Sequence, residues 1–260
     1  MNGIEKATAF LRAVALKDPD LATTYIDPDR YVEHNPPASD GAFGLMEYVS
    51  HLAEQGPDLE VLRAFEDEDY VVTQAQDSIA GKKVFFDVFK LENGLIVEHW
   101  AFSAEAGPPN ESGHTQADGP TEPNQHEDGE KNKAIVREYY ETVHLAGNHS
   151  KVPRYFSGDY CIRHEPNVAD GVTAFMRDLA VLTQCRTIEE IRLLLAQGDF
   201  VFLVAKGTAE GRPCAYIDLY RVETGKIVEH WGFPQEIPPQ REWRNNRGLL
   251  WHRAGNFYLR

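Results

Sequence analysis

The chain of 260 residues is long enough for about two ordinary domains, each with its own core. Hydrophobic residues make up 42% and charged residues 26%, a balance that excludes a largely disordered chain. The formal net charge of -15 repels phosphate backbones and anionic membranes, so we expect a small-molecule substrate or ligand as partner, and neither nucleic acid nor a membrane. The sequence has no leader pattern and no apolar stretch of membrane-spanning length, so a cytoplasmic location is the default expectation.

The first hundred residues predict helices followed by strands. Apolar residues recur at helical spacing in residues 4–17, and two further helical segments are expected at about 20–27 and 41–55. Runs rich in β-branched and aromatic residues then predict strands at 59–66, 69–80, 82–92 and 95–103, with Asn93-Gly94 as a hairpin turn. Helices followed by an antiparallel meander indicate an α+β domain, whose helices cover one face of a curved sheet and leave a pocket.

The same pattern returns after a polar gap. Residues 103–129 contain no Val, Ile, Leu, Met or aromatic residue and are rich in Pro, Gly, Glu and Asn, which is typical of an exposed linker. The second half predicts helices at 131–144, 150–157 and 171–183, and strands at 187–197, 199–210, 213–223 and 226–234. A tail rich in Arg and aromatic residues follows, and we expect it to dock on the acidic body or on a second subunit. A nucleic-acid arm is the alternative for the tail, which the net charge disfavours.

Three blocks of sequence repeat between the halves. Glu98-His99-Trp100 returns as Glu229-His230-Trp231, Asp87 and Asp218 hold the same place upstream, and His34 and His164 precede Asp-Gly at the same spacing. Blocks in register over about a hundred residues indicate duplication of a whole domain rather than a solenoid. We therefore predict domains at 1–104 and 130–236, a linker at 105–129 and a basic aromatic tail at 237–260.

The motifs Tyr31-x-x-His34-Asn-Pro, Asp40-Gly41, Asp87-x-Phe-Lys and Glu98-His99-Trp100 resemble those of SnoaL-like proteins, described as polyketide cyclases or aldol-condensation enzymes. These proteins belong to the nuclear-transport-factor-2-like superfamily, with ketosteroid isomerase. The resemblance covers both halves without the linker and the tail, and it implies two tandem cone-shaped α+β barrels. It also implies chemistry without a cofactor and an intramolecular pseudo-dimer of the two copies, and it leaves a homo-oligomer open.

Similarity to ketosteroid isomerase implies roles for two pairs of residues. His34 and His164 take the position of that family's general base, and Asp87 and Asp218 take that of the protonated acid beside the oxyanion. One departure concerns the residue after Glu-His-Trp. Many SnoaL-like sequences carry an Asp there, whereas this chain has Ala101 and Gly232, so a mechanism that rests on that carboxylate is in doubt in both copies.

The residues around Asp87 support the acid role. Asp87 alternates with Phe85 and Phe89, so on a strand all three face one side, and burial should raise the pKa of the carboxyl group. A carboxylic acid kept neutral in this way can donate a hydrogen bond to an enolate. Asp218, between Tyr216 and Tyr220, repeats the arrangement. The alternatives are that these carboxylates fix a Trp or His of the next strand, and that His34 and His164 bond to backbone at a turn.

The pairing register decides which residues share the pocket. A two-residue Asn-Gly turn places Asp87 opposite Trp100, and a three-residue loop places it opposite His99. His99 and Trp100 point to opposite faces of their strand, as do His230 and Trp231, and the sequence leaves open which pair lines the pocket. A metal site of His34, His99 and Asp87 lacks recognisable ligand spacing, so no metal is expected.

Our leading hypothesis is a cofactor-independent isomerase, cyclase or lyase that acts on a small carbonyl compound through an enolate. Its catalytic candidates are His34, Asp87, His99, His164, Asp218 and His230, and its substrate-binding candidates are Tyr31, Phe85, Phe89, Trp100, Tyr216 and Trp231. The first copy is favoured because Cys161 replaces Tyr31 in the second. The alternative is a non-catalytic small-molecule-binding protein with one or both copies degenerate.

Overall fold

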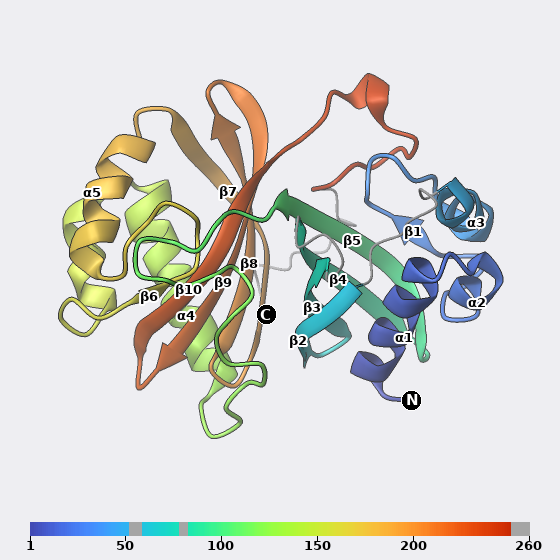
Figure 1. Ribbon diagram of the computed structural model, residues 1–260, viewed down its shortest axis with the longest axis horizontal. Coiled ribbons are helices and arrows are strands. Elements are labelled where there is room, and N and C mark those ends of the chain that lie inside the picture. The colour runs from blue at the N-terminus through green and yellow to red at the C-terminus, as the bar shows by residue number, and fades with distance from the viewer. Residues whose placement is uncertain (52–58, 78–82, 251–260) are drawn as a thin grey trace. The chain divides into compact units, whose positions relative to one another are not determined.

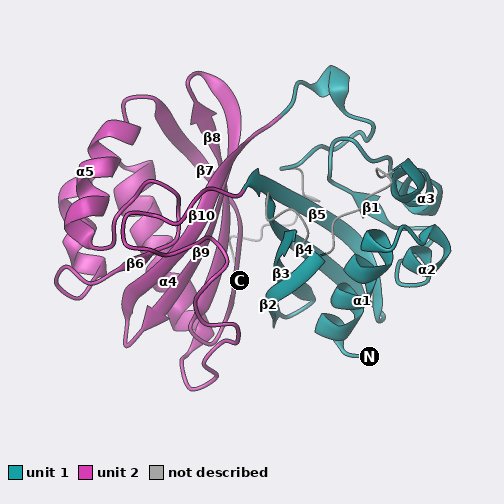
Figure 2. Ribbon diagram, in the orientation of Figure 1, with its two compact units in different colours: residues 1–105, 238–255 teal, residues 106–237, 256–260 magenta. Residues whose placement is uncertain are grey.

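A computed structural model describes residues 1–51, 59–77 and 83–250 of the chain (Figure 1). The described residues divide into two compact units (Figure 2). Unit 1 comprises residues 1–105 together with the described part of the C-terminal segment, 238–250, and unit 2 comprises residues 106–237. The segment that we predicted as the linker therefore lies almost entirely in unit 2. The described part of the predicted C-terminal tail lies almost entirely in unit 1.

Unit 1 contains three helices and a five-stranded sheet. The helices are α1 (Gly3–Ala15), α2 (Pro19–Thr23) and α3 (Gly41–His51), and the strands are β1 (Val32–Glu33), β2 (Leu59–Asp67), β3 (Tyr70–Asp77), β4 (Lys83–Glu92) and β5 (Leu95–Glu105). Helix α1 begins where Asn2 and Glu5 form a capping box, which satisfies amide groups at the helix start. The last residues of two predicted elements, the helix at 41–55 and the strand at 69–80, lie outside the described residues.

Unit 2 repeats this order of elements. Its helical segments are α4 (Gly129–Tyr139), the π-helix η1 (Tyr140–Leu145), the 3-10 helix η2 (His149–Tyr155) and α5 (Val172–Leu182). Its strands are β6 (Ile162–Arg163), β7 (Arg186–Gln197), β8 (Phe200–Ala209), β9 (Arg212–Glu223) and β10 (Lys226–Glu236). The 3-10 turn η3 (Gln240–Glu242) lies in the C-terminal segment, which belongs to unit 1. The predicted helix at 131–144 therefore changes from α to π geometry at Tyr140.

The two sheets have matching strand orders, β1-β5-β4-β3-β2 and β6-β10-β9-β8-β7. In each unit four long antiparallel strands form the sheet and helices pack on it, which confirms the α+β class and the cone-shaped fold. The predicted antiparallel meander of four strands is confirmed in both units. Each sheet also has a short strand that was not predicted, because β1 pairs parallel with β5 and β6 pairs parallel with β10. These strands are two residues long, too short to produce a recognisable alternation.

A β-bulge sets the register at the site. Asn93-Gly94 is a two-residue turn between Glu92 and Leu95, but the pairing shifts by one residue beyond Leu91 and Ile96. Asp87 therefore lies opposite Ala101, and neither of the two predicted registers is correct. The equivalent bulge in unit 2 places Asp218 opposite Gly232. Because alternate residues share a face, Asp87 and His99 point to the same side of the sheet.

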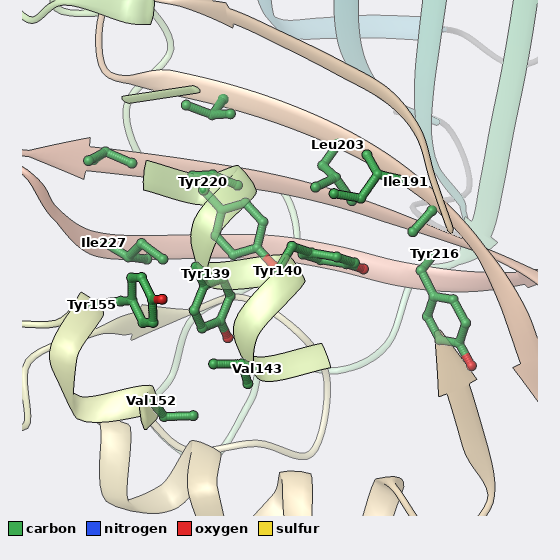
Figure 3. Packing of buried hydrophobic residues seen from close by; sticks show 14 of the residues in the cluster. Tyr139, Tyr140, Val143, Val152, Tyr155, Ile191, Leu203, Tyr216, Tyr220 and Ile227 are labelled. Atoms are coloured by element: carbon green, nitrogen blue, oxygen red, sulfur yellow. The ribbon is translucent and has the colours of Figure 1, made fainter. Parts of the chain in front are cut away.

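The core of each unit lies between its helices and this face of the sheet. In unit 1 it includes Phe10 of α1 and Phe89 of β4, which are at most 1% exposed. In unit 2 it is rich in tyrosine, and Figure 3 shows Tyr139, Tyr140 and Tyr220 gathered between the helical segment and the sheet. Buried hydroxyl groups need polar partners, so this core differs chemically from that of unit 1.

Candidate active site

In unit 1, His99 lies between two carboxylates. Its Nε2 is 3.0 Å from Asp87 Oδ1, and its Nδ1 is 3.1 Å from Glu33 Oε2. The ring of Phe89 stacks on the imidazole at 4.6 Å, and the Tyr31 hydroxyl donates to Glu33 over 2.6 Å. The sequence analysis predicted Asp87 and His99 as site residues, and the structure brings them together with Tyr31, while the second carboxylate, Glu33, was missed.

Burial and charge together set the protonation of this cluster. Burial alone would lower the pKa of His99, but the Glu33 and Asp87 carboxylates raise the pKa to about 10. Burial raises the pKa of Asp87, as predicted from its aromatic neighbours, and His99 partly opposes that rise. His99 is therefore an imidazolium at neutral pH. It is 7% exposed and Asp87 is 5% exposed, so the cluster is almost closed to solvent.

Unit 2 builds the same cluster from a different carboxylate. His230 Nε2 is 2.8 Å from Asp218 Oδ1, and His230 Nδ1 is 2.7 Å from Glu165 Oε1. Glu165 also pairs with Arg163, which stands at the position of Glu33. Burial would lower the pKa of His230, but Glu165 and Asp218 raise the pKa to about 9. Burial would raise the pKa of Glu165, but Arg163 and His230 hold that pKa well below its ordinary value.

The unit 2 cluster stands at the wall of a cavity of about 460 Å³. Asp218, His230, Glu165 and Arg163 all line it. The rest of the lining is largely aromatic and aliphatic and includes Tyr139, Tyr140, Phe156, Phe175, Leu179, Tyr216, Tyr220 and Ile227. A concave apolar site with a few converging polar groups is the usual form of a small-molecule site. We had favoured the first copy for the site, whereas this cavity belongs to the second.

The π-helix contributes two polar groups that the sequence analysis missed. The Tyr140 hydroxyl donates to Asp218 Oδ2 over 3.0 Å, and His144 Nε2 lies 3.3 Å from the Tyr139 hydroxyl. Burial lowers the pKa of His144 to about 4, so this imidazole is neutral beside the charged His230. π-helical turns inside α-helices occur frequently at functional sites. Their sequence looks like ordinary helix, so only the clustering of Tyr and His in 139–144 could have indicated this site.

Gly232 leaves space for the Asp218–His230 pair. A Cβ atom at this position would lie 2.6 Å from Asp218 Oδ1 and 3.1 Å from His230 Nε2. The first of these distances is far shorter than a van der Waals contact between carbon and oxygen. The position after Glu-His-Trp, where many SnoaL-like sequences carry Asp, therefore has no room for a side chain in unit 2, because Asp218 occupies the space next to Gly232.

The structure does not bring His34 and His164 to these clusters. His34 stacks on Trp100 with ring centroids 4.2 Å apart, and its Nε2 is 3.1 Å from Glu98 Oε2. His164 stacks on Trp231 at 4.5 Å, and its Nε2 is 2.8 Å from Glu229 Oε1. Glu98 and Trp100 alternate with His99 along β5, so these contacts lie on the opposite face of the sheet from Asp87.

Among the predicted substrate-binding residues, only Tyr216 lines the cavity. Tyr31 and Phe89 contact the unit 1 cluster, and Phe85 lies opposite Ser103 on the neighbouring strand. Trp100 and Trp231 hold the histidines of the other face. In unit 2 the residues Cys161, Arg163 and Glu165 line the cavity, whereas Ile162 and His164 do not. This alternation of residues along an extended segment was a signal in the sequence that could have identified Glu165, and we did not use it.

Each unit is thus an α+β cone with a histidine held between two carboxylates on one face of its sheet. Residues 7–99 match the family model of the SnoaL-like domain. The match lies within the first copy, and over these residues it confirms the predicted resemblance to SnoaL-like proteins.

Several solved structures are similar to part of the chain. A candidate polyketide cyclase from Acidithiobacillus ferrooxidans is 19% identical, with 40% of this chain and 88% of that chain covered and a TM-score of 0.35. A candidate ketosteroid isomerase from Kribbella flavida is 17% identical, with 44% and 86% covered and a TM-score of 0.39. An NTF2-like protein from Burkholderia xenovorans is 16% identical, with 42% and 92% covered and a TM-score of 0.35. No curated protein matches the chain.

The described helices include none that is both long enough and apolar enough to cross a membrane.

Proposed function

We propose that the cavity of unit 2 binds a small carbonyl compound and transfers a proton by acid–base chemistry without a cofactor. The reaction class is isomerisation, cyclisation or lyase cleavage through an enolate. The observation that carries the proposal is the Asp218–His230–Glu165 cluster at the wall of a cavity of about 460 Å³. Perturbed titratable groups that converge on an apolar pocket are the default sign of such chemistry.

Asp218 is the proposed base. Each of its two oxygens has one partner, His230 Nε2 at 2.8 Å and the Tyr140 hydroxyl at 3.0 Å. A carboxylate can accept more than two hydrogen bonds, which leaves room for a substrate group at Asp218. The C–H bond next to the carbonyl breaks, its proton moves to Asp218, and its electron pair moves to the carbonyl oxygen. Return of the proton to another carbon completes an isomerisation.

Two neighbours support the charge changes of this step. Burial and the nearby Asp218 raise the pKa of Tyr140 well above its ordinary value, so its hydroxyl stays protonated. When Asp218 takes up the substrate proton, this hydroxyl can turn its one hydrogen from Asp218 to the enolate oxygen. The His230 imidazolium keeps its second carboxylate, Glu165, when Asp218 becomes neutral. His164, which the sequence suggested as the base, is not used because it does not line the cavity.

The second candidate function is a non-catalytic binder. The observation that favours it is the loss of the family's carboxylate after Glu-His-Trp, at Ala101 and Gly232. Such a protein would use the aromatic lining for affinity and the cluster for orientation.

The test is a binding screen of enones, steroids and polyketide-like aromatic compounds, followed by α-proton exchange in deuterated water on each compound that binds. We expect Asp218→Asn to abolish exchange in the full chain and its matched variant in unit 1, Asp87→Asn, to retain it. Thermal melting of both variants separates loss of chemistry from loss of fold. Binding without exchange in the wild type supports the binder, and exchange that survives Asp218→Asn contradicts the proposed base.

A further inference from the structure

A second cluster in unit 2 lies outside the residues that line the cavity. It consists of His114 and Asp118, from the segment 106–129, and His164, which follows directly after β6; one ligand atom of each lies within 4.8 Å of the others. Asp118 stands between the two imidazoles. Its Oδ2 is 3.4 Å from His114 Nδ1, and its Oδ1 is 2.9 Å from His164 Nδ1.

The other ring nitrogen of each histidine faces a carboxylate. His164 Nε2 is 2.8 Å from Glu229 Oε1, and His114 Nε2 is 3.2 Å from Asp170 Oδ2. Histidines that bind metals nearly always donate their second N–H to a carboxylate or carbonyl, which fixes the tautomer that presents a bare nitrogen to the ion. In this cluster both histidines have such a carboxylate, and both Nδ1 atoms face Asp118. His164 Nδ1 also lies 2.7 Å from the carbonyl oxygen of Thr115, so without an ion this nitrogen carries a hydrogen, which a bound ion would displace.

The backbone around the cluster is fixed by side-chain hydrogen bonds. Asn110, which is 7% exposed, donates to the carbonyl of Arg163 over 2.6 Å and accepts from the His114 amide over 3.0 Å. The Thr115 amide donates to Asp118 Oδ1 over 2.9 Å, and Trp231 Nε1 donates to the Asp118 carbonyl over 3.0 Å. Donor atoms held in this way lose little freedom when an ion binds.

We propose that His114, Asp118 and His164 bind one divalent transition-metal ion, with Zn²⁺ as the best match, and that the ion fastens the segment 106–129 to the rest of unit 2. Two tetrahedral bonds of about 2.0–2.1 Å place their ligand atoms about 3.3 Å apart. The observed distances to Asp118, 2.9 Å to Oδ1 and 3.4 Å to Oδ2, are close to that value, and the ligand atoms of all three residues lie within 4.8 Å of one another. Imidazole nitrogens favour Zn²⁺ over Mg²⁺ and Ca²⁺, which prefer oxygen ligands alone. The proposal is independent of the proton chemistry, since none of the three residues lines the cavity.

Unit 1 lacks this arrangement among its described residues. His34 has the equivalent carboxylate, Glu98, and its Nδ1 also lies near a carbonyl oxygen, that of Gly248, but His34 belongs to no such group of three metal-binding side chains. The only set of three metal-binding side chains that the described residues contain is the one in unit 2.

The experiment is a Zn²⁺ titration of the full chain, purified without a histidine tag, in competition with a chromophoric chelator. We expect one equivalent to bind, and His114→Ala and Asp118→Asn each to weaken binding at least about tenfold. His126→Ala is the matched control, because His126 is an exposed histidine of the same segment. Zn²⁺ should raise the melting temperature of the wild type and of His126→Ala, but not that of His114→Ala. The proposal would be overturned if the wild type bound no stoichiometric Zn²⁺, or if His114→Ala and Asp118→Asn bound it as tightly as the wild type. It would also be overturned if His126→Ala lost as much affinity as these two variants.

Discussion

Replacing Gly232 with Ala should force apart the charged pair of unit 2. The new Cβ atom would lie 2.6 Å from Asp218 Oδ1, 2.9 Å from the Ile217 carbonyl oxygen and 3.1 Å from His230 Nε2. Overpacking of this kind costs about 1–3 kcal/mol, and each kcal/mol lowers the melting temperature of a domain of this size by about 2–4 °C. The displaced carboxylate should also leave His230 with one partner, so the pKa of His230 should fall from about 9 towards its ordinary value.

Thermal melting and an NMR titration of His230 measure the two effects separately. Ala101→Gly is the matched control, because Ala101 lies opposite Asp87 as Gly232 lies opposite Asp218. It removes a methyl group from a strand and should cost only about 0.5–1 kcal/mol, with the pKa of His230 unchanged. If Gly232→Ala keeps both the wild-type melting temperature and the wild-type pKa of His230, the steric argument for the site is refuted.

Three further predictions concern pH, the opposite face of the sheet and the π-helix. The folded-state pKa of His230 is raised from 6.5 to about 9, so its contribution of about 3 kcal/mol is complete below pH 6.5 and is lost as the pH rises through 9. Urea unfolding between pH 7 and 10 should show this loss, and His230→Gln should flatten the slope. His34→Ala should destabilise the protein by about 2–4 kcal/mol, because it removes a stacked ring and a partner of buried Glu98. Any proton exchange in unit 2 should persist in this variant. Loss of exchange with an unchanged melting temperature would instead return His34 to the catalytic candidates. Tyr140→Phe should slow proton exchange about 10²–10³-fold and leave the melting temperature within a few degrees of wild type, so an unchanged exchange rate would exclude Tyr140 as the enolate donor.

The fold could be predicted from the sequence because its signals are local. Helical spacing in 4–17 and alternation in 82–92 lead directly to α1 and β4, and the repeated Glu-His-Trp motif relates the two sheets. The bulge beside Lys90 could not be predicted, since it depends on pairing between strands rather than on the pattern within either one. That shift of one residue is why Asp87 meets Ala101 instead of Trp100 or His99.

The histidine of the first motif was misplaced for a related reason. His34 follows directly after β1, whose parallel pairing places Glu33 beside His99. Alternation then directs Glu33 to the face of His99 and His34 to the other face. A two-residue strand gives no pattern from which to infer this, so the conspicuous residue of the motif, His34, drew attention away from its neighbour. In unit 2 the carboxylate that faces His230 Nδ1 comes from Glu165, two residues after Arg163, the residue at the position of Glu33. A comparison of the two copies by position would therefore not indicate it.

The exchange of Glu33 for Arg163 explains how one scaffold can give two different environments. In unit 1 the imidazolium of His99 has two carboxylates, Glu33 and Asp87, and the group carries one excess negative charge. In unit 2 the guanidinium of Arg163 is added while Glu165 supplies the second carboxylate, so the group is neutral overall. A neutral group needs less solvation from outside, which allows an apolar cavity to form beside it without a high desolvation penalty. In unit 1 the Tyr31 hydroxyl donates to Glu33 and thereby stabilises the excess negative charge. The copy that carries Arg163 at this position therefore has the electrostatics better suited to a small uncharged ligand.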